Sequence, residues 1–162
     1  MATNGKKLIL INLAADILLL ISNELSIQKS VRTKKINSIK NDDVKKIELG
    51  KKISMLFHDR VKGNYTEFEA RTYIKKNTLQ KWMSGIRNIK RESLAKFVVG
   101  LSLDVKTADE LFLLQSHRLD PENNRFDCLI AASLNDNDAI DVFEEEVKKY
   151  FNNDFYNKVF KD

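Results

Sequence analysis

A cluster of cationic, amide and hydroxyl side chains in the middle of the chain offers the clearest chemistry of this sequence. Lysine and arginine neutralise phosphates, and asparagine or glutamine can form two hydrogen bonds with the edge of an adenine base. Such a combination is typical of surfaces that contact duplex DNA. The candidate contact residues are Lys75, Lys76, Asn77, Thr78, Gln80, Lys81, Ser84, Arg87, Asn88, Lys90 and Arg91.

The spacing within this cluster predicts a short helix over residues 76–84. Its apolar anchors are Leu79, Trp82 and Met83. Because Trp82 follows Leu79 at helical spacing, we expect it in the core rather than as a platform for base stacking. The lysine and amide side chains then fall on the other face of the helix, which suits the DNA major groove.

Two further cations, Lys90 and Arg91, fall at the predicted start of the next helix, residues 91–99. A cation at that end of a helix opposes the helix dipole and is slightly unfavourable. A phosphate bound at the helix start would compensate for this arrangement. We therefore expect both residues to contact the DNA backbone.

Residues 74–85, IKKNTLQKWMSG, resemble the second half of the helix-turn-helix in lambda-repressor-like, Xre-type regulators, whose common form is roughly I-S-x-S-T-L-S-x-W-x-S-G. Residues 87–94 are similar to the basic loop and next helix of that family, and parts of 103–121 resemble an extension carried by some members. The resemblance covers about residues 65–134. It implies a helical domain that binds duplex DNA in the major groove.

Three positions depart from the family pattern. The turn glycine of the family falls at Tyr73, for which a positive φ would cost about 1 kcal/mol. The serine that caps the recognition helix falls at Lys75, and the small alanine between the two helices falls at Glu69, with Ala70 one place later. The first helix therefore has a different register, or the two helices cross differently.

The elements that position these residues are predicted to be helices, because the chain has only five glycines and one proline and shows no alternating strand pattern. The fold class is all-α: a compact helical domain with a helix-turn-helix core and flanking N- and C-terminal helices. Capping patterns predict further helix starts. These starts are Asn41–Asp43, Thr66, Thr107, Asp120-Pro121 and, for one long last helix, Asp136–Asp138.

The chain divides into three predicted regions. Residues 1–40 form an N-terminal apolar helix plus a basic linker, and residues 41–118 form the helix-turn-helix DNA-binding domain. Residues 119–162 form a C-terminal helical extension, which packs on the same domain or dimerises.

Residues 8–21, LILINLAADILLLI, form the most apolar segment of the chain. Asp16 interrupts it, no small-residue cleavage site follows, and 14 residues are too few to span a bilayer. We expect a helix buried on most sides, which crosses the core or meets a second copy of itself. Residues 22–43 are polar, basic and poorly periodic, and we interpret them as a connection with room for a short helical piece, either an arm on the DNA backbone or a mobile linker.

Charge is segregated along the chain. Residues 1–100 carry 21 Lys and Arg against 9 Asp and Glu, whereas residues 101–162 carry 7 against 14. The basic part is expected to attract polyanions. The single Cys128 lies in an apolar run, which predicts a buried thiol in a reducing cytoplasm.

No spacing of His58, His117 or Cys128 indicates a metal site, and no nucleophile elbow, phosphate loop or HExxH motif is present. We expect no enzyme activity and no cofactor. The first hypothesis is a cytoplasmic, sequence-specific duplex DNA-binding protein that acts as a homodimer. It would serve as a transcriptional regulator or replication/partition factor of a phage, plasmid or bacterium. We expect no association with a membrane. The alternative is an interaction protein of the same fold, an anti-defence or host-takeover factor that docks on another protein or nucleoprotein complex.

Overall fold

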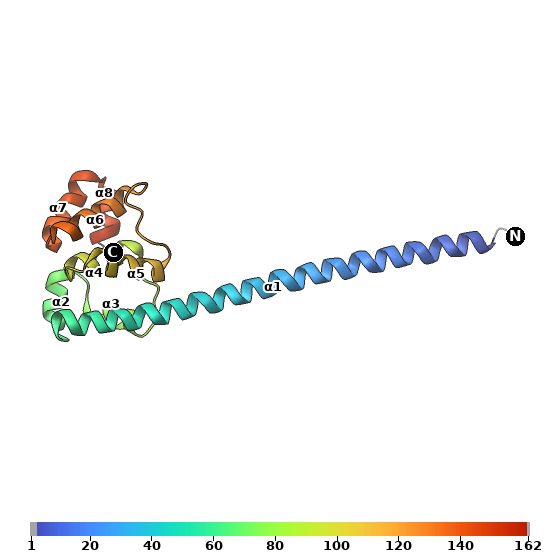
Figure 1. The fold of residues 1–162 in the computed structure, drawn as a ribbon, viewed down its shortest axis with the longest axis horizontal. Coiled ribbons are helices and arrows are strands. Elements are labelled where there is room, and N and C mark those ends of the chain that lie inside the picture. The colour runs from blue at the N-terminus through green and yellow to red at the C-terminus, as the bar shows by residue number, and fades with distance from the viewer. Residues whose placement is uncertain (1–2, 162) are drawn as a thin grey trace. The chain divides into compact units, whose positions relative to one another are not determined.

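The computed structural model describes residues 3–161, with side chains from Ala15 onward except that of Lys40. The prediction of an all-α fold is confirmed, because this part of the chain contains eight helices and no strand (Figure 1). The helices are α1 (Thr3–Val61), α2 (Tyr65–Thr72), α3 (Lys76–Met83), α4 (Arg91–Gly100), α5 (Val105–Gln115), α6 (Arg125–Asp136), α7 (Ile140–Tyr150) and α8 (Asn153–Phe160).

Two compact units make up the chain: the N-terminal unit, Met1–Asp43, and the helical body, Val44–Asp162. Helix α1 contributes to both, so the basic segment predicted as a connection, residues 22–43, is helical. This segment lacks proline and glycine, and its described side chains are exposed on every side. A helix without a buried face has no periodic apolar pattern, which is why the sequence did not reveal it. Asn41–Asp43 accordingly lie inside α1 rather than at its start.

The core of the helical body is built around α4. Every residue from Leu94 to Gly100 is buried, and α4 contacts α2, α5, α6, α7 and α8 (Figure 1). The last four turns of α1 add a buried stripe to the same core. The stripe consists of Leu49, Ile53, Phe57 and Val61. Helix α4 therefore supports the elements on which the candidate contact residues lie.

Two glycines allow close approach of helix backbones beside α2 and α3. A Cβ atom at Gly100 would lie 2.2 Å from the carbonyl oxygen of Arg71, near the end of α2. One at Gly50 would lie 2.6 Å from the carbonyl oxygen of Trp82, near the end of α3. Both glycines are helical, so their value here is the missing side chain, which lets α4 and α1 lie directly against the next backbone.

Several helix starts differ by a few residues from the predicted capping patterns. Asn64 caps α2 by accepting the N–H of Glu67, and Asp104 caps α5 by accepting the N–H of Thr107. The predicted caps Thr66 and Thr107 therefore lie inside their helices. Pro121 begins a turn rather than a helix, and Asn124 caps α6 instead. In each case a nearby Asn or Asp side chain supplies the acceptor.

The predicted single last helix is two helices, α7 and α8. Helix α7 ends before Phe151, whose backbone is extended, and Asn152 then caps α8. The Tyr156 hydroxyl donates to Glu144 Oε1 across the pair at 2.5 Å. This hydrogen bond lowers the pKa of the Glu144 carboxyl below its ordinary value and raises the pKa of Tyr156. The break turns α8 back, so that Val159 is buried in the core.

Cys128 is exposed, so the prediction of a buried thiol is wrong. Helix α6 directs Phe126, Ile130 and their helical neighbours into the core, and Cys128 falls outside that stripe. Asp127 occupies a buried position instead. The apolar run around Cys128 thus contained a charged residue on its inward face.

Candidate nucleic-acid interface

The turn between α2 and α3 comprises residues 73–75, and its geometry follows from Tyr73. This residue has φ 56° and ψ 21°, in the left-handed region, and its N–H donates to the carbonyl oxygen of Glu69 at 2.9 Å. Tyr73 is one of the non-glycine residues with a positive φ in the described part of the chain. The Thr72 hydroxyl accepts the N–H of Ile74 at 3.2 Å and stabilises the same turn. Helix α3 therefore begins directly after a tight reversal of the chain.

The start of α3 is capped by Glu69 from the preceding helix, α2. Lys75 occupies the cap position and its side chain forms no capping hydrogen bond. Instead, Glu69 Oε1, from α2, accepts the N–H of Lys76 at 2.6 Å. An acid at a helix start is also favourable to the helix dipole. Glu69 therefore supplies the side-chain acceptor that Lys75 does not, and the first N–H of α3 is already occupied.

Helix α3 presents one buried and one exposed face. Leu79 and Trp82 are 0% and 2% exposed, so the expectation that Trp82 belongs to the core is confirmed. The exposed side chains of α3 span about 140° of the helix circumference at 100° per residue. They are Lys76, Asn77, Gln80 and Lys81, with Ser84 directly after them. The face carries two cations, two amides and no acid, and Lys76 Nζ lies 4.7 Å from the centre of the Tyr65 ring.

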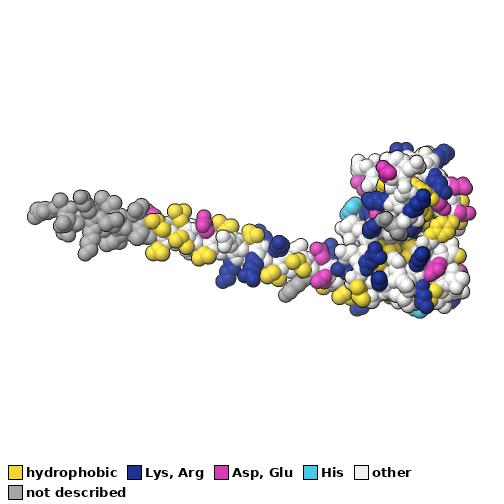
Figure 2. Space-filling model, turned by 180° about the vertical axis from the view of Figure 1, so that it is seen from behind, with side chains coloured by type: hydrophobic (Ala, Val, Ile, Leu, Met, Phe, Trp, Pro, Cys, Tyr) yellow, Lys and Arg dark blue, Asp and Glu magenta, His cyan; other side chains and the backbone are white. Residues whose placement is uncertain are grey.

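The remaining candidates lie around this helix in the helical body. Lys75, Arg87, Asn88 and Lys90 are exposed in the turn before α3 and in the loop after it, and Thr78 is half-buried. Figure 2 shows one face of the helical body, on which Lys and Arg side chains are spread among acidic and apolar ones. Apart from Arg91, the predicted contact residues therefore belong to one exposed helix and its two flanking connections.

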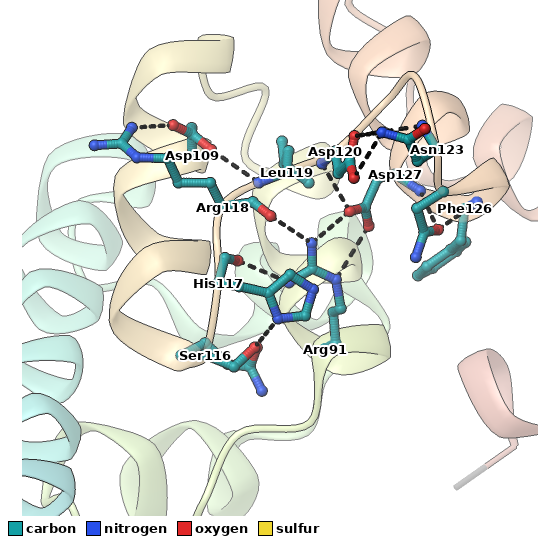
Figure 3. Close-up of polar contacts among 12 residues, drawn as sticks. Arg91, Asp109, Ser116, His117, Arg118, Leu119, Asp120, Asn123, Phe126 and Asp127 are labelled. Atoms are coloured by element: carbon teal, nitrogen blue, oxygen red, sulfur yellow. Dashed lines mark hydrogen bonds and ion pairs between the residues drawn. The ribbon is translucent and has the colours of Figure 1, made fainter.

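Arg91 differs from the other candidates, because its guanidinium group is engaged inside the protein (Figure 3). Its Nε and Nη2 donate to the two carboxylate oxygens of Asp127 at 3.0 and 2.6 Å. Its Nη1 donates to the carbonyl oxygen of His117 at 3.0 Å, and Nη2 donates to that of Arg118 at 3.2 Å. The Arg91 side chain therefore holds the α5–α6 connection, and its contact with a phosphate stays a prediction.

Asp127 completes this internal network, and nothing in the local sequence indicated it. Its side chain is 0% exposed, and Oδ2 also accepts the N–H of Asp120 at 2.9 Å. The Arg91 guanidinium lies 4.6 Å from the centre of the Phe112 ring. The two charged groups are 36 residues apart in sequence. Because the two residues are so far apart in the chain, the spacing of neighbouring residues does not predict their ion pair.

The described residues contain no cluster of three metal-ligating side chains. His117 Nδ1 lies 2.9 Å from the Ser116 hydroxyl, and His58 lies at the end of α1 against Phe57. Among the helices that the structure describes, none has the length and hydropathy needed to cross a membrane.

Comparisons of the chain with protein-family models, with curated proteins and with solved structures find no match.

Proposed function

We propose that the chain binds duplex DNA through the exposed face of α3, in the manner of a lambda-repressor-like helix-turn-helix. It acts as a transcriptional regulator or as a replication or partition factor. Gln80 and Asn77 form hydrogen bonds with base edges in the major groove, while Lys81 and the cations of the flanking connections bind backbone phosphates.

The observation that carries this proposal is the combination of the tight turn with the chemistry of α3. Helix α3 follows α2 after three residues, with Tyr73 left-handed, and buries Leu79 and Trp82. Its outward face holds only cations, amides and hydroxyls among the described side chains. A buried anchor under an acid-free, amide-bearing face is what a groove-reading helix requires.

Dimerisation belongs to the same proposal, because one short helix buries little surface on DNA and paired half-sites are the usual solution. The N-terminal unit offers the contact surface. The side chains from Ile17 to Ile21 are 49–67% exposed, and Leu25 is 61% exposed. Apolar exposure on this scale marks an interaction surface. A second copy presents the same apolar face and covers it.

Ile86 favours the alternative function, an interaction protein that docks on another protein. It lies in the loop directly after α3 and is 77% exposed, more than any other large apolar side chain in the described part of the chain. An isolated apolar group beside a recognition surface is suited to a protein pocket rather than to a phosphate backbone. The salt dependence of binding distinguishes the two functions, since only DNA binding releases many counterions.

The proposal is tested by reversing charge on the exposed face of α3. Gln80→Glu with Lys81→Glu is expected to abolish binding to a mixed-sequence duplex, measured by fluorescence anisotropy at several salt concentrations. Both positions are exposed, so the melting temperature and helical circular dichroism should change little. The matched control, Asn135→Glu with Lys149→Glu, makes the same change in charge at exposed positions of α6 and α7 and should retain binding. Undiminished binding by the α3 variant would exclude α3 as the contact element.

A further inference from the structure

A stretch of α1 in the N-terminal unit carries positive charge without any acid. Residues 25–41, which we call the basic segment, contain five cations, and the nearest acids are Glu24 and Asp42 on either side. Figure 2 shows Lys and Arg side chains among apolar ones along this part of α1. The four cations whose side chains are described are all exposed. They are Lys29, Arg32, Lys34 and Lys35.

The charge of the basic segment is not balanced within α1. No acid lies three or four residues from any of the four described cations, so the helix offers them no ion pair along its own surface. Like charges three residues apart, as in Lys29, Arg32 and Lys35, repel one another on a helix. Burial does not compensate, because every described side chain of the segment is exposed. A bound polyanion supplies the attraction that this helix lacks.

The cations are distributed around the helix rather than along one face. At 100° per residue, Lys34 lies about 160° from Arg32 around the helix axis. The apolar residues are divided in the same way, since Ile27 and Ile36 lie on opposite sides of the helix. A flat anionic lipid surface contacts one side of a helix and requires an apolar face there. The basic segment has no such face, so the distribution of its side chains favours a partner that surrounds the helix.

The major groove of duplex DNA is a partner of that shape. It is about 12 Å wide and admits one α-helix, whose diameter with side chains is about 10–12 Å. Phosphates of both strands border the groove, so cations on opposite sides of the helix can each contact a phosphate. The major groove of an RNA duplex is deep and too narrow for this contact. The exposed amides of Gln28 and Asn37 add groups that can form hydrogen bonds with base edges.

We propose that the basic segment of α1 lies in the major groove of duplex DNA as a second contact element, with Arg32, Lys34 and Lys35 bound to phosphates of the two strands. The choice of duplex DNA as the partner rests on the function proposed above. The contact element is independent of it, because the basic segment belongs to the N-terminal unit and α3 belongs to the helical body. The stretch interpreted from the sequence as a connection is then a binding helix.

The test neutralises three cations of the basic segment in the intact chain, in a variant that combines Arg32→Gln, Lys34→Gln and Lys35→Gln. Glutamine is a good helix former, so the helical circular dichroism should be retained. Affinity for a mixed-sequence DNA duplex, measured by fluorescence anisotropy, should fall about tenfold or more at low salt. The slope of log affinity against log salt should become shallower by about two to three units, since each phosphate contact contributes about 0.9. An unchanged affinity and slope overturn the proposal.

A matched control variant removes one arginine and two lysines elsewhere in the chain and should bind the duplex like the wild type. It combines Lys106→Gln, Arg125→Gln and Lys149→Gln, at exposed positions of α5, α6 and α7. Equal losses of affinity in the two triple variants would show that only net charge matters, and would overturn the assignment to α1.

Two further probes identify the polyanion. An RNA duplex of the same sequence should bind the wild-type chain more weakly than the DNA duplex, and vesicles of phosphatidylserine and phosphatidylcholine should not bind. Equal affinity for the RNA duplex overturns the placement in the major groove. Vesicle binding that the basic-segment variant loses assigns the segment to a lipid surface and overturns the proposal.

Failure of this proposal is distinguishable from failure of α3 as the contact element. If the basic-segment variant loses duplex affinity while Gln80→Glu with Lys81→Glu keeps it, the basic segment stands and the function proposed for α3 falls. The reverse result keeps the function proposed for α3 and overturns the basic segment.

Discussion

At the scale of single residues, Arg91 shows that a cation at a helix start can be compensated from within the protein. Its position at the start of α4 suggested a phosphate, since a cation there opposes the helix dipole. The structure supplies a different compensation, the buried carboxylate of Asp127, which it contacts through two nitrogens. Arg91 forms a bidentate pair and also donates to two carbonyl oxygens, so it fixes the α5–α6 connection against α4 and α6.

We predict that Arg91→Ala lowers the free energy of unfolding by about 3–5 kcal/mol, because it leaves the Asp127 carboxylate buried without its partner. Urea denaturation followed by circular dichroism measures this loss. The double variant Arg91→Met with Asp127→Leu should recover part of it, since no unpaired charge remains. A single variant as stable as the wild type would contradict the structural role and restore Arg91 as a candidate DNA contact.

At the scale of elements, the α2–turn–α3 unit is held in place by close backbone contacts from α4 and α1. Tyr73 sets the turn, Glu69 caps α3, and Gly100 lets α4 approach the end of α2. Without these contacts two eight-residue helices would be too short to persist. The orientation of the candidate recognition helix therefore depends on packing in the core more than on its own helix propensity.

Gly100→Ala tests this dependence. Alanine normally stabilises a helix interior by about 1 kcal/mol relative to glycine. Here the added Cβ would lie 2.2 Å from the Arg71 carbonyl oxygen and 2.8 Å from Thr72 Cα, so we expect a net loss of about 1–3 kcal/mol in thermal or urea unfolding. Ala132→Gly, at an exposed position of α6, provides the ordinary propensity difference for comparison. A Gly100→Ala variant that melts higher than the wild type would refute the close packing.

At the scale of the whole molecule, the N-terminal unit and the helical body differ in how their helices are stabilised. The body buries a continuous core, whereas the N-terminal unit is one helix whose described side chains are all exposed. A single helix in water lacks the tertiary burial that stabilises most helices in proteins. Its exposed leucines and isoleucines are the reason we assign it to contact with a second copy.

Ile21→Lys with Leu25→Lys is predicted to convert the dimer to a monomer in sedimentation equilibrium at micromolar concentration, because both side chains are exposed apolar groups of α1. It should also weaken duplex binding, since paired half-sites are no longer engaged. The control, Asn23→Lys with Ser30→Lys, adds the same charge at exposed polar positions of α1 and should remain dimeric. A monomeric wild-type chain would refute the dimer.

Local patterns in the sequence were sufficient for the fold class, for the limits of α3 and α4 to within about a residue, and for the orientation of α3. These properties depend on turn residues and on apolar spacing over a few positions, such as Leu79 and Trp82. The left-handed conformation of Tyr73 was not predicted, because the sequence left open how the two helices meet.

Tertiary structure alone decided the protein partner of Arg91, the exposure of Cys128 and the burial of Val159 in α8. Each depends on which segments distant in sequence come together, such as Asp127 with Arg91. The continuous helix over residues 22–43 was not predicted for a different reason. A fully exposed helix buries no side chains, so its sequence needs no apolar residues at helical spacing. Long-range packing leaves little trace in local periodicity, since any of several surfaces could have covered the same side chain.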